Sequence, residues 1–466
     1  EAIPLQTGAM TRLQRFFGRA SVSYNNWAFL EATGSYDYDS RIGDPYNFNI
    51  KNISYFYPGA SVSAVLSDAI PALKNSRNLS FLKLRGAISK TGNVNLNPYN
   101  TENTYNLGGN FPYGSLIGFT SNNTLYRPDY QPEFVINKEV GIEVGFLKNR
   151  INFEATAYTQ DNTNQIITVA YSGATGYSNA LLNAASFTNK GIELDLRLTP
   201  LIKIGSASIN FKANYTFQKN VVNQLIEGVD ELGIGNGNYI IKGMSAYTFK
   251  LTDYVRDSIG RVIVDRSTGL PTQDPVIKNF GQTLPKHILG LSLNADWKGF
   301  TLSVVADYRG GNQIYSGNLG NPMDFSGISY RSAQNGRQPF IMPNSAYNDG
   351  SGKFVANTDV YTSGGYNFYS TAISTSVNSN YISSGAFWKL REVSLGYTLP
   401  ASLFTNTPIK GATFTLTGRN LLTLLPESNQ WTDPEFSTTT GNAQGVSGLG
   451  NTPPTRLFGA NLSVNF

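Results

Sequence analysis

The strongest constraint on the fold of this chain is an alternation of apolar and polar residues with a period of two. Leu82 and Leu84, for example, alternate with Lys83 and Arg85, and the same pattern recurs many times along the 466 residues. Successive side chains of a β-strand point to opposite faces, so this period predicts strands that are apolar on one face and polar on the other. We therefore expect an all-β, antiparallel fold.

The pattern predicts thirteen strands, most of them close to ten residues long, which suits a tilted strand that crosses a membrane. Charged side chains keep to the polar face. The predicted strands are 12–24, 27–38, 55–66, 80–90, 134–147, 150–160, 187–199, 206–218, 286–297, 300–309, 386–398, 412–422 and 456–466.

The connections between these strands are of two unequal kinds, and the two kinds alternate. Short turns lie at Asn25-Asn26, 147–150 and 297–299, for example. The long polar connections are 37–54, 93–132, 161–186, 219–285, 310–384 and 423–455. This segregation is typical of a bacterial outer-membrane β-barrel, which has short periplasmic turns and long extracellular loops. The β-prone region 236–267 is expected to form a hairpin within one extracellular loop.

The last strand supports the membrane interpretation. Its apolar residues alternate with polar residues and glycine up to the aromatic end of the chain; they are Phe458, Ala460, Leu462, Val464 and Phe466. A terminal alternating strand that ends in Phe looks like the segment by which bacterial outer-membrane proteins are recognised for barrel assembly.

Composition excludes several other classes of protein. Charged residues make up 14% of the chain and aromatic residues 12%, whereas an ordinary soluble domain is about one quarter charged. Cysteine is absent and His287 is the only histidine, which excludes disulfide scaffolds, thiolate clusters and multi-histidine metal sites. His287 is expected to be a polar residue at the extracellular end of a strand, and no catalytic motif surrounds it, so we expect no enzyme activity.

Cofactors and nucleic acid are not expected either. The spacing of Asp253, Asp257 and Asp265 does not match a twelve-residue calcium loop, so a calcium ion in this loop is only a minor alternative. The net charge of +5 comes from scattered lysines and arginines, which does not favour nucleic-acid binding. Apolar stretches are far shorter than the roughly 20 residues of a membrane-spanning helix.

Four phrases, in this order, resemble the C-terminal half of a SusC/RagA-type TonB-dependent outer-membrane transporter. They are LKLRGAISKTGN at 82–93, NKGIELDL at 189–196, FWKLREVSLGYTLP at 387–400 and GRNLL at 418–422. The resemblance covers nearly the whole chain, although the connections 93–132 and 310–384 match no recognisable phrase of the family.

This resemblance implies a plugged barrel of about 22 strands, of which residues 1–466 supply the last thirteen, without the plug domain. It also implies TonB-dependent import of a glycan or oligopeptide nutrient across the outer membrane. The implied partners are the upstream part of the same transporter, a SusD-like lipoprotein lid, the TonB complex and outer-membrane lipid. An odd strand number places Glu1 in an extracellular loop, at a site of cleavage or truncation.

The candidate contact for a ligand or for the lid is an aromatic group in a Gly/Ser-rich part of the connection 310–384. Its members are Tyr361, Tyr366, Phe368 and Tyr369. Aromatic rings stack on sugars and on protein surfaces, but ordinary packing within the loop is an alternative for all four. The inward-facing charged residues, with mixed signs, are expected to pair mainly with one another and with the plug.

Two other functions stay open at this point. One is an outer-membrane barrel without TonB-coupled uptake, either a porin or a secretion-associated barrel. The other is a secreted β-sandwich adhesin or carbohydrate-binding protein, in which the apolar strand faces would form an internal core.

Overall fold

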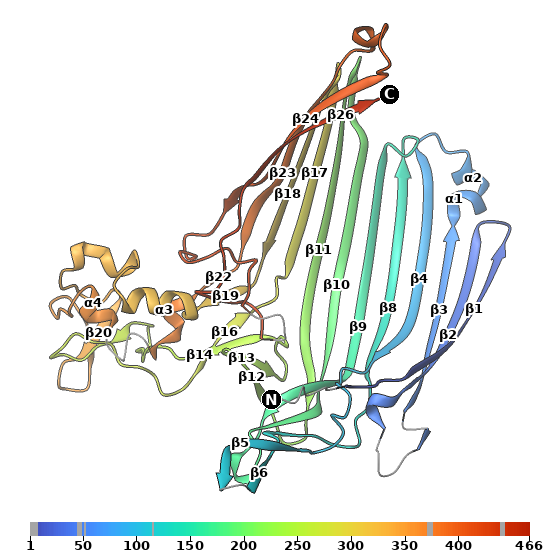
Figure 1. Cartoon of the computed structure of the whole chain (residues 1–466). Helices are drawn as coiled ribbons and strands as arrows, with labels where there is room; N and C mark the ends of the chain where they lie inside the picture. Colours follow the sequence, from blue (N-terminus) through green and yellow to red (C-terminus); the bar gives the residue numbers. More distant parts are fainter. Residues whose placement is uncertain (1–7, 44–48, 51–52, 114–115, 371–375, 439–442) are drawn as a thin grey trace.

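A computed structural model describes residues 8–43, 49–50, 53–113, 116–370, 376–438 and 443–466 (Figure 1). One curved 14-stranded sheet dominates these residues, and its strands follow one another in chain order. The path consists of β1 (Leu13–Tyr24), β2 (Ala28–Asp39), β3 (Ser54–Val65), β4 (Leu79–Asn93), β8 (Glu133–Phe146), β9 (Ile151–Ala170), β10 (Asn179–Ile204), β11 (Ala207–Leu225), β17 (His287–Trp297), β18 (Phe300–Gly310), β23 (Phe387–Thr398), β24 (Gly411–Leu424) and β26 (Leu457–Asn465). The short strand β7 (Thr124–Leu125) pairs with β10 outside this path.

Each predicted strand falls on one strand of this path, and neighbouring strands of the path are antiparallel. The described residues form a single wall rather than two sheets packed face to face. The β-sandwich alternative is therefore wrong.

The short turns have the backbone conformation that tight hairpins require. Asn25 and Asn26 both have positive φ, 46° and 58°, and the Trp27 amide donates to the Tyr24 carbonyl at 3.1 Å. Lys298 and Gly299 repeat this arrangement with φ of 47° and 86°. Two successive residues with positive φ form the turn whose twist matches the flanking strands, and Asn and Gly adopt it most easily.

One long connection is shorter than predicted. The connection 161–186 was expected to be a loop, but β9 continues to Ala170 and β10 begins at Asn179, so that only 171–178 connects them. The register shifts between Asn183 and Phe187, and Asn164 has a φ of 58°. These irregularities break the period of two, which is why the sequence pattern does not extend through this hairpin.

The other long connections carry small sheets and helices at one end of the wall. Region 236–267 contains a hairpin, as predicted, because its β13 (Asn238–Ile241) and β14 (Thr248–Leu251) pair antiparallel. The hairpin is part of a four-stranded sheet with β12 (Glu231–Gly235) and β16 (Lys278–Gln282), which the sequence did not predict. The remaining short strands are β5 (Tyr105–Tyr113), β6 (Leu116–Ser121), β15 (Val262–Ile263), β19 (Gln313–Ser316), β20 (Ser345–Asn348), β21 (Phe354–Ala356), β22 (Ile382–Ser384) and β25 (Val446–Gly448).

Helical segments are short. The α-helices are α1 (Leu66–Ala69), α2 (Pro71–Lys74), α3 (Gly317–Phe325) and α4 (Tyr366–Tyr369), and the 3-10 helices are Ser40–Ile42, Gly173–Thr175, Arg331–Arg337, Asn378–Tyr381 and Ala401–Phe404. Within the described residues, no helix is long and apolar enough to cross a membrane.

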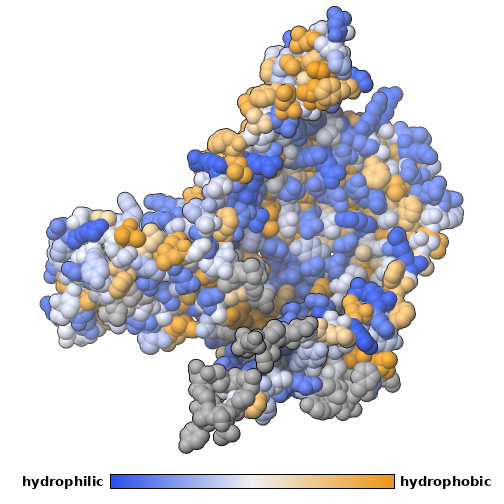
Figure 2. All heavy atoms as spheres, viewed as in Figure 1, coloured by the Kyte–Doolittle hydropathy of each residue, from blue (hydrophilic) through white to orange (hydrophobic). Residues whose placement is uncertain are grey.

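The two faces of the wall differ in polarity as the alternation predicts. On β11 the residues Ile209, Phe211, Ala213, Tyr215 and Phe217 lie on the outer face, and the polar residues between them face the hollow of the sheet. Figure 2 looks into this hollow, where hydrophilic residues gather, and shows hydrophobic residues over β24 and β26. Apolar residues on the outer face of the sheet are what a barrel exposes to lipid.

The last strand follows the predicted pattern. Phe458, Ala460, Leu462 and Val464 lie opposite outward residues of β24, and the side chains of Phe458 and Leu462 are 78% and 64% exposed. Phe466 follows the end of β26 and is also exposed. The role of these five residues in barrel assembly stays a prediction.

Aromatic residues gather near both ends of the outer face. At the short-turn end Tyr24 packs edge-on against Trp27, with ring centroids 5.9 Å apart. At the other end His287 begins β17, as predicted for it, and its Nδ1 lies 2.7 Å from the Tyr215 hydroxyl. Such belts are typical of membrane interfaces.

Replacing the outward Leu196 on β10 by arginine tests the assignment of the two faces. Leu196→Arg should lower the free energy of unfolding by about 2–4 kcal/mol, because it would place a charge in the middle of the lipid-facing band. Equilibrium urea unfolding in lipid vesicles measures the change. Thr216→Arg is the matched control, because Thr216 faces the hollow directly opposite Glu193; an equal loss in both variants would contradict the assignment.

Candidate functional site

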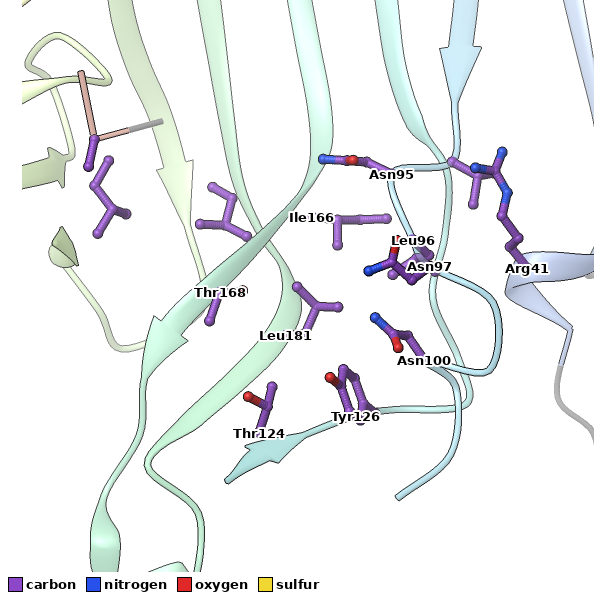
Figure 3. A pocket seen from close by; sticks show the side chains of 14 residues that line it. Arg41, Asn95, Leu96, Asn97, Asn100, Thr124, Tyr126, Ile166, Thr168 and Leu181 are labelled. Carbon is purple, nitrogen blue, oxygen red and sulfur yellow. The ribbon is translucent and has the colours of Figure 1, made fainter. Parts of the chain in front are cut away.

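A polar pocket of about 720 Å³ lies where the long connections meet the inner side of the wall (Figure 3). Its side chains come from the segment that follows β4, from the extended ends of β9 and β10, and from three other connections. The lining residues are Arg41, Val94, Asn95, Leu96, Asn97, Asn100, Thr124, Tyr126, Ile166, Ile167, Thr168, Leu181, Ile234 and Ala443.

The segment that follows β4 continues to alternate after its strand ends. Val94 and Leu96 are buried, in one apolar cluster with Tyr55 and Ile166, while Asn95 and Asn97 stay exposed. In Figure 3 the amide groups of Asn95, Asn97 and Asn100 point from this segment toward β9 and β10. The buried pair thus fixes the position of the amides.

The charge of Arg41 is neutralised within the pocket wall. Its Nη2 lies 2.5 Å from a carboxylate oxygen of Asp39, and Asp39 also accepts the Arg41 backbone amide at 3.0 Å. The hydrogen bond that the Arg41 side chain donates to the Asp39 carboxylate raises the pKa of Arg41 above its usual value. Arg41 therefore stays charged and oriented, yet contributes little net charge to the pocket.

The opposite rim of the pocket is held by β7 and by an asparagine outside the lining. Asn103 accepts the Tyr126 backbone amide at 2.8 Å and donates to the Tyr126 carbonyl at 2.9 Å. Thr124 pairs with Asn179 of β10. These contacts hold the Tyr126 ring at the edge of the pocket.

The pocket is suited to a neutral, polar ligand. Within the described part of the chain, the side-chain amides of Asn95, Asn97 and Asn100 have no hydrogen-bond partner. Each amide can both donate and accept, as peptide groups and sugar hydroxyls require.

The sequence did not identify the residues that line the pocket. Some of them lie in the connection 93–132, which matches no recognisable phrase of the family, and the others come from segments distant in the sequence. The alternation of buried Val94 and Leu96 with exposed Asn95 and Asn97 was the available signal. It indicates a strand-like segment, but it does not say which surface the asparagines face.

The predicted aromatic group lies elsewhere, in the connection 310–384, and the structure divides it. Phe368 is buried against Phe340, with ring centroids 5.2 Å apart, and Tyr369 packs on Phe368. Tyr361 and Tyr366 are 61% and 50% exposed. The first pair therefore packs within its loop, and contact with a ligand or lid stays a prediction for the second pair.

This connection is tied to the connection 423–455 by an arginine among aromatic rings. The Arg331 guanidinium lies 5.6 Å from the Tyr369 ring, 5.3 Å from Tyr381 and 5.6 Å from Trp431. Its Nη2 is 3.1 Å from the fully buried carboxylate of Asp324. Two long connections thus form one packed unit beside the wall.

Charged side chains inside the hollow pair with one another, as predicted. Arg391 lies 2.6 Å from Asp307 of the neighbouring strand and 2.6 Å from Glu435 of the connection 423–455. Lys389 also contacts Glu435 at 2.6 Å. Farther round the wall Arg85 lies 2.8 Å from Glu154. The contacts of Lys389 and Arg391 on β23 with Glu435 fasten the connection 423–455 to the inside of the wall.

The carboxylates considered for calcium do not form one site. Asp253 is engaged by Arg256 and Ser379, and Asp257 by Arg261. The side chain of Ser267 and the amides of Ser267 and Thr268 bind Asp265 and lower its pKa. Among the described residues, no group of three or more metal-binding side chains is present.

Comparison with models of known protein families identifies the family of this barrel. The model described as "TonB dependent receptor-like, beta-barrel" matches residues 4–421. The chain belongs to this family. It is 24% identical over 94% of its length to TonB-dependent receptor P26 of Formosa agariphila, and 21% identical over 98% of its length to TonB-dependent receptor P3 of the same organism. These matches cover 44% and 46% of the two receptors.

Solved structures share the fold of this TonB-dependent receptor barrel. The structure of the RagAB peptide transporter matches with a TM-score of 0.77 at 20% identity, over 98% of this chain and 48% of that one. The RagAB peptide importer in the "open-open" state matches with a TM-score of 0.73. The predicted TonB-dependent outer-membrane barrel is thus confirmed, and its fold agrees with the predicted resemblance to the SusC/RagA type. The barrel belongs to the bacterial outer membrane.

The chain spans about half the length of the curated relatives it matches. The total of about 22 strands and the plug outside this chain therefore stay predictions. TonB-dependent receptors are transporters.

The contact of Glu435 with the wall predicts a pH-dependent release of the connection 423–455. Burial alone would raise the pKa of Glu435, but hydrogen bonds from Arg391 and Lys389 outweigh it and lower this pKa to about 2. A lowered pKa stabilises the folded state above the unfolded value of about 4.5, and this stabilisation is lost as the pH falls toward 2. A nitroxide on Gln430→Cys should therefore become more mobile between about pH 4 and pH 2.

Glu435→Gln is the variant that isolates this effect. The probe should then be mobile at neutral pH, with little further change on acidification. Glu427→Gln, an exposed residue of the same connection, should keep the pH transition. A transition that persists unchanged in Glu435→Gln would assign it to another group.

Proposed function

We propose that the complete protein imports a neutral polar oligomer, a glycan or an oligopeptide, across the outer membrane with energy from the TonB complex. The observation that carries this proposal is the pocket of unpaired amides beside Tyr126, at the end of the wall with the long connections. In this proposal the long connections are extracellular, so a ligand reaches Asn97 and Asn100 before it reaches the barrel interior.

The pocket favours a ligand with repeated hydrogen-bonding groups. Asn95, Asn97 and Asn100 are spaced along one segment and all present amides to the same space. An extended peptide or a short glycan offers donors and acceptors at regular intervals, whereas a compact ion does not. The neutralised Arg41 adds orientation without selecting for an anion.

The proposal includes a SusD-like lipoprotein that closes over the long connections. Tyr366 packs edge-on against Phe325, with centroids 6.2 Å apart, and both remain about half exposed. Tyr330 and Ile328 add 77% and 71% exposed side chains from the same connection. An exposed group of this kind is what a protein partner covers. The upstream part of the transporter would supply the plug and the contact with TonB.

Replacing two pocket amides tests the uptake proposal. Asn97→Ala and Asn100→Ala should each weaken binding about fivefold, because a hydrogen bond contributes about 1 kcal/mol. Ligand binding to the purified full-length transporter, measured by calorimetry with oligopeptide and oligosaccharide mixtures, checks the size of the effect. Asn75→Ala, at the short-turn end of the wall, is the matched control and should leave affinity unchanged.

Uptake in cells separates the transporter from a passive barrel. Growth on the ligand should require both the transporter and a functional TonB complex. Uptake that continues without TonB would favour the porin alternative instead. Full affinity in the doubly substituted Asn97→Ala, Asn100→Ala variant would exclude this pocket while leaving TonB-dependent import open.

The lid proposal makes a separate prediction. The double variant Tyr361→Ser, Tyr366→Ser should weaken the binding of the lid lipoprotein by at least about fivefold, because exposed aromatic rings often dominate such interfaces. Binding of the isolated lipoprotein to the solubilised transporter measures this. Tyr24→Ser removes an exposed ring at the opposite end and should have no effect. Unchanged lid affinity in the double variant would remove these two rings from the interface.

A further inference from the structure

The outer face of the wall carries a row of lysines near the long connections. Lys138 on β8 and Lys190 on β10 both lie opposite Thr159 of β9, and Lys190 lies directly opposite Lys219 of β11. The row therefore spans four neighbouring strands. All three lysines are exposed.

The period of two places these lysines outside the barrel. Lys219 is two residues beyond Phe217 on β11, and Lys190 is two residues before Ile192 on β10. Phe217 and Ile192 are paired with each other, and Ile192 is 46% exposed on the outer face. Lysines on this face meet lipid or headgroups rather than the hollow of the sheet.

The depth of the row corresponds to the edge of the apolar band. From Ile209 to Phe217 the outward residues of β11 cover eight steps, about 27 Å along the strand. A strand tilt of about 40° reduces this to roughly 20 Å of height, close to the apolar band of about 25 Å on such barrels. Lys219 is the next outward residue, so it lies where the headgroups begin.

The two paired lysines differ from Lys138 in their electrostatic surroundings. Neither Lys190 nor Lys219 forms an ion pair within the described ranges of the chain. Like charges directly opposite each other on neighbouring strands repel and destabilise the pair. Lys138 differs, because its Nζ lies 3.6 Å from Asp161, which also accepts the Thr188 hydroxyl at 2.8 Å. An anion shared by Lys190 and Lys219 would remove their repulsion.

An apolar groove of about 610 Å³ lies on the same outer face and ends at Lys138. One row of its wall consists of Leu30, Val62, Gly86, Val140 and Ala157, each paired with the next. The groove exists because the middle residue of this row, Gly86, has no side chain. A Cβ added at Gly86 would meet no atom closer than 3.8 Å, so a side chain could enter this space without a clash.

We infer that this surface binds a phosphorylated glycolipid of the outer leaflet. Lys190 and Lys219 hold a headgroup phosphate between them, Lys138 extends the basic row, and the groove below Lys138 takes an acyl chain. The groove distinguishes a lipid from free phosphate, because an inorganic ion would use only the lysines. This inference does not depend on which oligomer the protein imports.

Native mass spectrometry of the full-length transporter, purified from outer membranes and then re-supplied with the phosphorylated glycolipid, tests the site. Lys190→Ser with Lys219→Ser should reduce the retained lipid at least about tenfold, since each lysine near an anionic surface contributes about fivefold. Lys190→Arg with Lys219→Arg keeps the charge and should retain the lipid. Lys148→Ser with Lys203→Ser removes two exposed charges at the short-turn end and is the control.

The groove has its own test. Gly86→Leu with Ala157→Leu should fill it and lower lipid retention, although both lysines remain. Dephosphorylated lipid should bind the unchanged protein as weakly as phosphorylated lipid binds the serine variant. Equal retention by the serine variant and its control, with heat-modifiable folding intact, would overturn the inference. Displacement of the lipid by equimolar inorganic phosphate would reassign the lysines to a free anion.

Discussion

The structure depends on the hydrogen-bonded pairing of every strand with its neighbours. In hydrocarbon an unpaired backbone amide costs several kcal/mol, so strands can cross lipid only when each is paired along its length. A slip by one residue would turn Leu194 and Leu196 inward and Asp195 outward. The register therefore fixes at once which residues meet lipid and which meet the hollow, and every site described above follows from it.

The long connections are held in place against the wall in three ways. The inward positions carry charges that can reach a loop, and Arg391 and Lys389 fasten Glu435 in this way. The pocket uses a second means, because β9 and β10 continue past the membrane band and supply Ile166 and Leu181 as a rigid back wall. The third means is the packing of loop on loop around Arg331.

The strands and short turns were predictable because one local signal determines them. Alternation gives the strand, and residues such as Asn25 and Asn26 give the turn, without knowledge of any distant part of the chain. The extension of β9 was missed where Asn164 and the neighbouring register shifts break the alternation. The pocket was missed for a different reason: Asn97 and Tyr126 are 29 positions apart along the numbering. The pairing of β7 with β10 and the hydrogen bonds between Asn103 and Tyr126 bring their segments together, and the sequence shows neither.

The two sides of β10 connect the membrane to the pocket. Its outward Lys190 lies at the edge of the apolar band, and nine residues earlier Leu181 lines the pocket. Strands resist stretching, because their length is fixed at about 3.3 Å per residue. The height of the pocket above the membrane is therefore set by where the lysine row rests among the headgroups. A phosphate held between Lys190 and Lys219 would fix that height, and the hydrogen-bonded β9–β10 hairpin would transmit it to the amides that face a ligand.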